Sequence, residues 1–138
     1  MMRTCTGNGS PIFITWLATM LILGSPVDAG AREGTASWYS VESCHREGTS
    51  GIMANGQPLD GRQLTAASWD YPFGTRLLVR YGAKAVVVVV TDRGPARILV
   101  RQGRLLDLSE AAFEALAPLA RGVIKVRIEV VRGGDRSG

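Results

Sequence analysis

A run of five valines at residues 86–90 leads directly into Thr-Asp-Arg-Gly-Pro at residues 91–95. A carboxyl group at the end of a buried strand is suited to general acid–base chemistry. The apolar site favours the protonated acid, and the strand fixes its direction. A structural interpretation is equally available, because Asp92 can accept backbone N–H bonds in the turn or pair with an arginine. Both interpretations stay open at this level.

Three neighbouring charged residues are further candidates. The planar fork of Arg93 suits a carboxylate on a ligand, but it also suits a hydrogen-bond donor that closes the barrel. Asp107 stands between two leucines just before a helix, where it either shares the cleft of Asp92 or binds N–H groups of the loop and helix. Asp70 is either a second acid or a solvated surface residue.

Aromatic side chains flank these positions. Flat aromatic groups at a surface can bind the apolar face of a ligand, and large aromatics also fill small barrels. We interpret Trp69 and Tyr71 as either ligand-binding or core residues and Trp38 as core. Ser68 can donate a hydrogen bond but carries no charge. His45, the single histidine, is interpreted as a surface residue.

The periodicity of the chain predicts six short strands and one short helix. The strands are expected at 35–40, 64–68, 76–81, 84–91, 104–108 and 122–131, and the helix at 109–117. Ser109 is the expected N-cap, and the polar segment 42–51 is expected to be a loop. The unbroken valine run predicts burial on both faces of its strand. Short strands without a βαβ rhythm favour an all-β closed barrel or sandwich.

The N-terminal segment has the layout of a secretory signal. An apolar core of about 13 residues, 12–24, is shorter than the roughly 20 that span a bilayer, and small residues precede Gly30. The alternative is a buried helix or an uncleaved anchor. We expect a signal peptide at 1–29, a linker at 30–33, a barrel at 34–131 and a flexible tail at 132–138. Cys5 leaves with the signal, so Cys44 has no disulfide partner.

Charge narrows the choice of partner. Sixteen Lys and Arg face 12 Asp and Glu, for a net charge of +4. A mild basic excess suits an anionic polymer at a cell surface. No cluster of five like charges and no alternation of basic and aromatic residues favours nucleic acid. No spacing of Cys, His and acidic residues suggests a metal site, and we expect no cofactor.

Six short motifs occur in a familiar order. They are Gly34-Thr-Ala-Ser-Trp-Tyr39, Ala54-Asn-Gly56, Leu64-Thr-Ala-Ala67, Pro72-Phe-Gly-Thr75, Thr91-Asp-Arg-Gly-Pro95 and Leu106-Asp-Leu-Ser109. Together they resemble the rare lipoprotein A (RlpA)-like family of double-psi β-barrels, which are relatives of the expansin barrel domain. The resemblance implies a six-stranded barrel. It also implies a lytic transglycosylase that cleaves peptidoglycan between N-acetylmuramic acid and N-acetylglucosamine and leaves a 1,6-anhydro end.

The resemblance assigns the family's key acid to Asp92. Its usual second residue is a histidine after the Thr-Ala-Ala run, and here Ser68 occupies that position. One carboxyl group suffices for such a reaction, because the nucleophile is a hydroxyl of the sugar itself. The departure at Ser68 favours the alternative of a non-catalytic, expansin-like glycan-binding module. A third hypothesis is a protein-interaction barrel, such as an inhibitor or a partner of other envelope proteins.

The expected partner is therefore the glycan strand of peptidoglycan. With such a partner, Trp69 and Tyr71 are candidates for a glycan cleft, because sugar rings bury their apolar faces on flat aromatic groups, and Ser68 could donate a hydrogen bond to a sugar. The expected location is the periplasm or the cell exterior, with no membrane attachment after signal cleavage.

Overall fold

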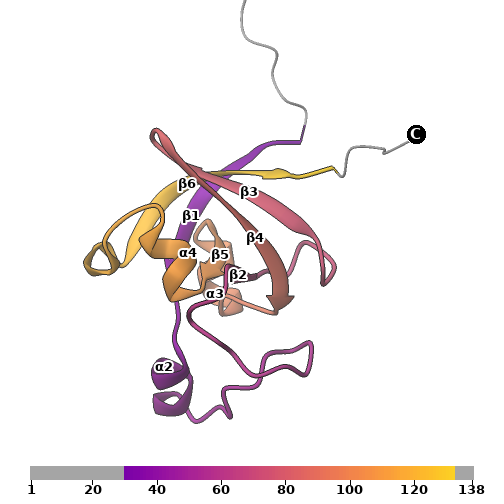
Figure 1. Cartoon of the computed structure of the whole chain (residues 1–138), viewed down its shortest axis with the longest axis vertical. Helices are drawn as coiled ribbons and strands as arrows, with labels where there is room; N and C mark the ends of the chain where they lie inside the picture. Colours follow the sequence, from indigo (N-terminus) through magenta and orange to yellow (C-terminus); the bar gives the residue numbers. More distant parts are fainter. Residues whose placement is uncertain (1–29, 133–138) are drawn as a thin grey trace, which may run out of the picture.

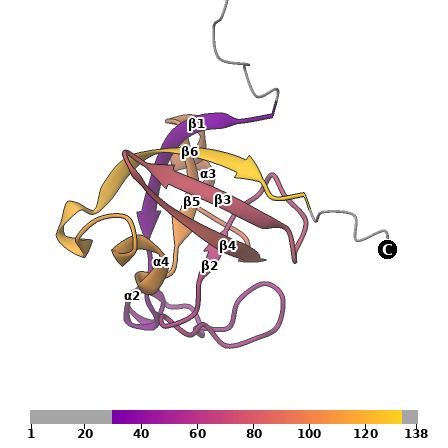
Figure 2. The same ribbon diagram turned by 45° about the horizontal axis from the view of Figure 1, so that its top comes forward.

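The computed structural model describes residues 30–132 and forms a closed barrel of six strands (Figures 1 and 2). The strands are β1 Arg32–Trp38, β2 Thr65–Ala67, β3 Arg76–Tyr81, β4 Lys84–Asp92, β5 Arg104–Leu108 and β6 Val123–Val130. Around the barrel they run in the order β1-β5-β2-β4-β3-β6. Two neighbouring pairs, β1 with β5 and β2 with β4, are parallel and the others are antiparallel. The predicted six-stranded barrel is confirmed.

The expectation of one short helix was wrong. The described chain also contains α2 Val41–Arg46 and α3 Arg97–Arg101, besides α4 Glu110–Glu114 and the 3-10 turn η2 Leu119–Arg121. Neither α2 nor α3 contains a fully buried side chain, so neither has the apolar periodicity that reveals a helix in sequence. A reciprocal cap starts α2, in which Ser40 and Ser43 each accept the other's backbone N–H.

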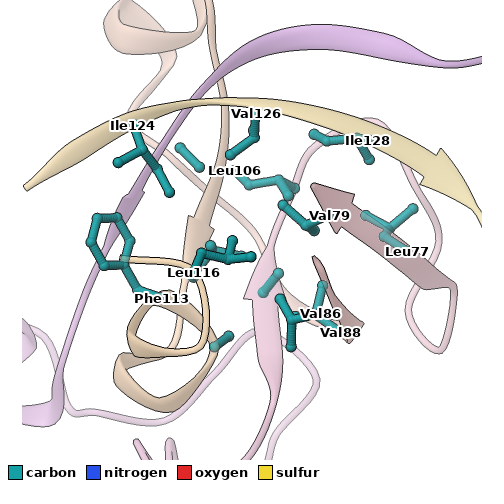
Figure 3. Packing of buried hydrophobic residues seen from close by; sticks show 14 of the residues in the cluster. Leu77, Val79, Val86, Val88, Leu106, Phe113, Leu116, Ile124, Val126 and Ile128 are labelled. Carbon is teal, nitrogen blue, oxygen red and sulfur yellow. The ribbon is translucent and has the colours of Figure 1, made fainter. Parts of the chain in front are cut away.

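The core fills the barrel with one face of each strand and is closed by α4 (Figure 3). Phe113 and Leu116, from α4 and the turn after it, are fully buried beside the strands. The predicted cap of α4 is present, since Ser109 Oγ accepts the Ala112 N–H at 3.4 Å. Ser109 Oγ also donates to the Gln63 carbonyl at 2.6 Å, which links the helix start to the segment before β2.

The valine strand β4 is buried on one face only. Val88 and Val90 are fully buried, whereas Val87 and Val89 are partly exposed on the outer face. The expected burial on both faces was wrong, because the strand belongs to a small closed barrel whose residues alternate between interior and exterior. Valine is still favoured at the outer positions, since β-branched side chains suit a pleated, half-covered surface.

The described segment, residues 30–132, includes the barrel predicted at 34–131. β1 begins at Arg32, before the expected start at Gly34. A Cβ on Gly34 would lie 2.6 Å from Leu105 Cγ and 2.7 Å from the Gly103 oxygen, so β1 approaches the start of β5 too closely for a side chain. The predicted signal peptide and nearly all of the predicted tail lie outside the described residues. Within 30–132, no helix is long and apolar enough to span a membrane.

The alternation along β4 predicts unequal costs for neighbouring valines. Val88→Ala should lower the free energy of unfolding by about 2 kcal/mol, because two buried methyl groups are lost and a cavity remains. Val87→Ala, the matched control, should cost less than about 1 kcal/mol. Urea unfolding curves of both variants measure the difference, and equal losses would contradict the one-faced burial of β4.

Candidate active site

The short strand β2 brings two carboxyl groups to one end of the barrel. Ala67 pairs with Asp92 of β4 on one side and with Asp107 of β5 on the other. Neighbouring strands are roughly 4.8 Å apart, so the two aspartates are about 10 Å apart at their Cα atoms. The chain then turns over this point. A Cβ on Gly94 would lie 3.3 Å from Ala67 Cβ and 3.6 Å from Asp107 Oδ2.

Asp92 is held by three hydrogen bonds. Its Oδ1 accepts the backbone N–H groups of Ala54 and Arg93, both at 2.8 Å. Its Oδ2 accepts the hydroxyl of Tyr39 at 3.0 Å. Burial, reinforced by the charge of Asp92, raises the pKa of Tyr39 far above its usual value, so the phenol stays a proton donor. The backbone contacts match the turn interpretation of Asp92, while the tyrosine fixes the orientation of its second oxygen.

Asp107 lies in a different environment. Its Oδ1 accepts the hydroxyl of Ser37, which in turn accepts a hydrogen bond from Arg104 Nη1 at 3.4 Å. Burial raises the pKa of Asp107, and the charges of Glu47 and Asp92 add to that rise, while Ser37 and Arg104 oppose it. No partner for Oδ2 occurs within residues 30–132. Asp107 therefore retains its proton to higher pH than a solvated aspartate.

Arg93 makes the contacts of a structural donor. Its Nη1 donates to the carbonyls of Ser68 and Tyr71, both at 2.8 Å, and its guanidinium lies 4.0 Å from the ring centroid of Phe73. These contacts hold the segment after β2 against the turn after β4. Nη1 of Arg93, one of the donors considered for a ligand carboxylate, is therefore occupied by contacts within the protein.

Ser68 and Asp70 each have partners within the protein. Ser68 is fully buried, and its Oγ accepts the Asp70 N–H at 3.1 Å. Its backbone N–H donates to the Asp92 carbonyl at 3.1 Å, so it extends the pairing of β2 with β4. Asp70 forms an ion pair with Arg32 at 2.8 Å, with both side chains well exposed.

Trp38 and Trp69, the tryptophans within residues 30–132, have different environments. Trp38 packs on the core and donates Nε1–H to the Leu119 carbonyl at 3.0 Å, in line with its predicted core position. Trp69 is 38% exposed and donates Nε1–H to the Pro95 carbonyl at 2.7 Å. Tyr71 is partly buried against the core. Trp69 is therefore the one of these aromatics that presents a large exposed surface beside the turn at 93–95.

The structure thus gathers Asp92, Asp107 and Tyr39 around the turn at Gly94, with Trp69 at the rim. Two partners of Asp92, Tyr39 and the Ala54 N–H, could not be found from sequence, since each is separated from it by dozens of residues.

His45 lies on α2 beside Gly51 and is exposed. Cys44 is a half-buried free thiol.

A separate cavity of about 590 Å³ opens elsewhere on the barrel. It is lined by β1, β3 and β6 and by the turns at Gly82 and Gly103, with Arg80, Lys125 and Arg127 among its side chains. None of the candidate site residues lines it. The two regions belong to different ends of β4, whose nine residues from Lys84 to Asp92 span roughly 27 Å.

A closed double-psi barrel with paired carboxyl groups beside its Gly-Pro turn defines the class of protein. Residues 31–128 match the family model described as lytic transglycolase. The chain therefore belongs to this family, which is the RlpA-like family indicated by its motifs.

Curated relatives carry consistent names. The chain is 41% identical over 103 residues to the probable endolytic peptidoglycan transglycosylase RlpA of Aquifex aeolicus, covering 73% of this chain and 42% of that protein. It is 33% identical over 120 residues to the endolytic peptidoglycan transglycosylase RlpA of Haemophilus influenzae, covering 83% and 39%. The chain thus spans about two fifths of the length of these relatives.

Solved structures of similar fold include proteins of other kinds. The Streptomyces papain inhibitor superposes with a TM-score of 0.58 at 28% identity, covering 75% of this chain and 96% of that one. A mutant Clavibacter michiganensis expansin in complex with cellohexaose superposes with a TM-score of 0.54 at 25% identity, covering 78% and 52%. The expected kinship with the expansin barrel is confirmed.

The raised pKa of Asp107 predicts a pH-dependent effect on stability. The folded state binds this proton more tightly than the unfolded state, so ionising Asp107 costs stability as pH rises through its folded pKa. Asp107→Asn removes that cost. Its gain in free energy of unfolding, relative to the parent protein, should therefore be larger at pH 7 than at pH 3.

Urea unfolding at the two pH values measures the gain. Asp60→Asn is the control, because the neighbouring Arg62 lowers the pKa of this partly exposed carboxyl group, which predicts the opposite trend with pH. A gain for Asp107→Asn that is constant or shrinks toward pH 7 would contradict the assignment.

Proposed function

We propose that the barrel is a lytic transglycosylase of peptidoglycan that acts in cell wall remodelling. The observation that carries this proposal is the placement of Asp92 and Asp107 on either side of Ala67, beneath the turn at Gly94. Family membership and the names of the curated relatives support it. The substrate is the glycan strand, cut between N-acetylmuramic acid and N-acetylglucosamine.

The reaction needs one proton donor and one proton acceptor. The muramyl O6 hydroxyl attacks C1 of the same sugar, so the C1–O6 bond forms while the bond from C1 to the departing oxygen breaks. The hydroxyl proton passes to a carboxylate, and the departing oxygen receives a proton from a carboxylic acid. No water enters, unlike in hydrolytic glycosidases, and the product is a 1,6-anhydro sugar.

The two aspartates suit these two roles. Partial burial raises the pKa of Asp107, which is the direction of shift that a general acid needs. Asp92, fixed by Tyr39 and two backbone N–H groups, is the oriented carboxylate that accepts the hydroxyl proton. In this arrangement Asp107 supplies the second titratable group that Ser68 does not provide.

A second candidate function is a non-catalytic, expansin-like glycan-binding module. It is favoured by the fully buried, uncharged Ser68 at the position of the usual family histidine. The expansin neighbour was solved in complex with cellohexaose, which shows that a barrel of this fold occurs in a protein that binds a glycan. In this module Trp69 would hold the glycan, and Asp92 would serve the turn alone.

The site of action that we propose is the periplasm or the cell exterior. The support is the signal-like pattern of residues 1–29. N-terminal sequencing of the exported protein should give Gly30 as the first residue. A protein that retains Met1 in the envelope would contradict cleavage.

Digestion of purified sacculi tests the main proposal. The protein should release 1,6-anhydro muropeptides, detected by mass spectrometry, and Asp92→Asn should reduce their yield at least about 100-fold, because an essential proton transfer is lost. Asp70→Asn is the matched control, since it removes an exposed, ion-paired carboxylate that belongs to neither proton-transfer group.

Three outcomes are informative. Anhydro products that disappear in Asp92→Asn support the transglycosylase. Equal yields from Asp92→Asn and the parent protein would remove Asp92 from the mechanism. Co-sedimentation of the parent protein with sacculi, without any product, would favour the binding module.

A further inference from the structure

Two guanidinium groups lie on aromatic rings at the rim of the site, and they differ in their freedom. Arg93 lies 4.0 Å from the centroid of Phe73 and Arg97 lies 4.1 Å from that of Trp69. Arg93 also donates to two backbone carbonyls. The side chain of Arg97, the exposed first residue of α3, makes no hydrogen bond or ion pair with any described residue. Its donors are therefore available to a ligand.

The stack on Trp69 places Arg97 beside the two segments that follow Ala67 and Asp92. The Trp69 ring is fixed by its bond to the Pro95 carbonyl at 2.7 Å, and Pro95 follows Asp92 by three residues. Trp69 itself follows Ala67, which pairs with both aspartates. A guanidinium lying over a ring keeps its N–H donors in its own plane, so they point sideways from the stack toward solvent or a bound group.

A third cation near this aromatic segment, Arg32, is already paired, since it donates to Asp70 at 2.8 Å. Arg97 is thus the arginine beside Trp69 whose side chain has neither an acidic partner nor a hydrogen-bond acceptor among the described residues. A planar cation with free paired donors is the group that best matches a carboxylate.

We propose that Arg97, supported by Trp69, recognises a carboxylate carried by the muramyl units of the glycan and so selects acidic glycans over neutral ones. This inference rests on the proposed function and specifies the carboxylate as the group of the substrate that the site binds. The carboxylate is that of the lactyl group where peptides have been removed, or one of the stem peptide where they remain. Trp69 contributes the apolar surface for a sugar ring, which neutral and acidic glycans share.

Binding measurements distinguish the contribution of the Arg97 charge from that of the Trp69 ring. The background is Asp92→Asn, which prevents turnover. The ligands are a peptide-free muramyl glycan oligomer and chitohexaose, which has the N-acetylated backbone without carboxylates. Arg97→Gln should weaken binding of the muramyl oligomer roughly three- to tenfold and leave chitohexaose binding unchanged. Arg121→Gln, an exposed arginine of η2, is the charge-matched control and should change neither.

Two further measurements identify which carboxylate is bound and whether binding requires the planar guanidinium of Arg97. Repeating the titration with peptide-bearing oligomers shows whether the loss in Arg97→Gln is larger on the lactyl or on the peptide carboxylate. Arg97→Lys keeps the charge but loses the planar fork, so it should bind the muramyl oligomer with intermediate affinity.

The outcomes also separate this inference from the proposed function. If Arg97→Gln binds muramyl oligomers as tightly as its parent while the wild-type protein still forms anhydro products, the recognition role is overturned and the transglycosylase stands. Equal weakening for both ligands would mean that Arg97 only supports the Trp69 ring, which also overturns the role. If the Asp92→Asn parent binds neither oligomer and the wild-type protein forms no product, both proposals fail together.

Discussion

The pairing of β2 on both of its sides is the constraint on which the site depends. This strand has only three residues, all buried, and it runs parallel to β4 and antiparallel to β5. Because of that double pairing, residues 15 positions apart in sequence, Asp92 and Asp107, flank a single alanine. A Cβ on Gly94 would lie 3.3 Å from Ala67 Cβ, tighter than an ordinary contact, so the turn at Gly94 passes close to this alanine. Small residues here are a geometric requirement of the site.

The two carboxyl groups have different hydrogen-bond partners, and only a few residues of the barrel supply them. Asp92 lies at the end of β4, where the chain leaves the sheet and backbone N–H groups become available to it. Asp107 lies within β5, where the ladder already uses the backbone and only the hydroxyl of Ser37 reaches its side chain. Burial then dominates at Asp107 and raises its pKa. A pair of acids in unlike environments is the usual arrangement for acid–base work.

Sequence periodicity predicted the strands and α4 because their buried faces repeat at fixed spacing. It did not predict α2 and α3, which bury no complete face, nor the exposed side of β4. Motifs indicated Asp92, but its partners Tyr39 and Ala54 depend on loops folding back over the barrel end. The carbonyl contacts of Arg93 and the stack of Arg97 on Trp69 are likewise set by tertiary structure. Residue type alone therefore indicated Arg93 in two alternative roles and did not indicate Arg97.

The most direct test of this account is a crystal structure of the Asp92→Asn variant with a peptide-free muramyl oligosaccharide. The account predicts a glycan that crosses the turn at Gly94, with a glycosidic oxygen within hydrogen-bond reach of Asp107 and a sugar ring against Trp69. A glycan bound in the cavity beside Arg80, Lys125 and Arg127, with nothing at the Gly94 turn, would contradict it. In that case the paired carboxyl groups would be structural, and the functional surface would lie at the other end of β4.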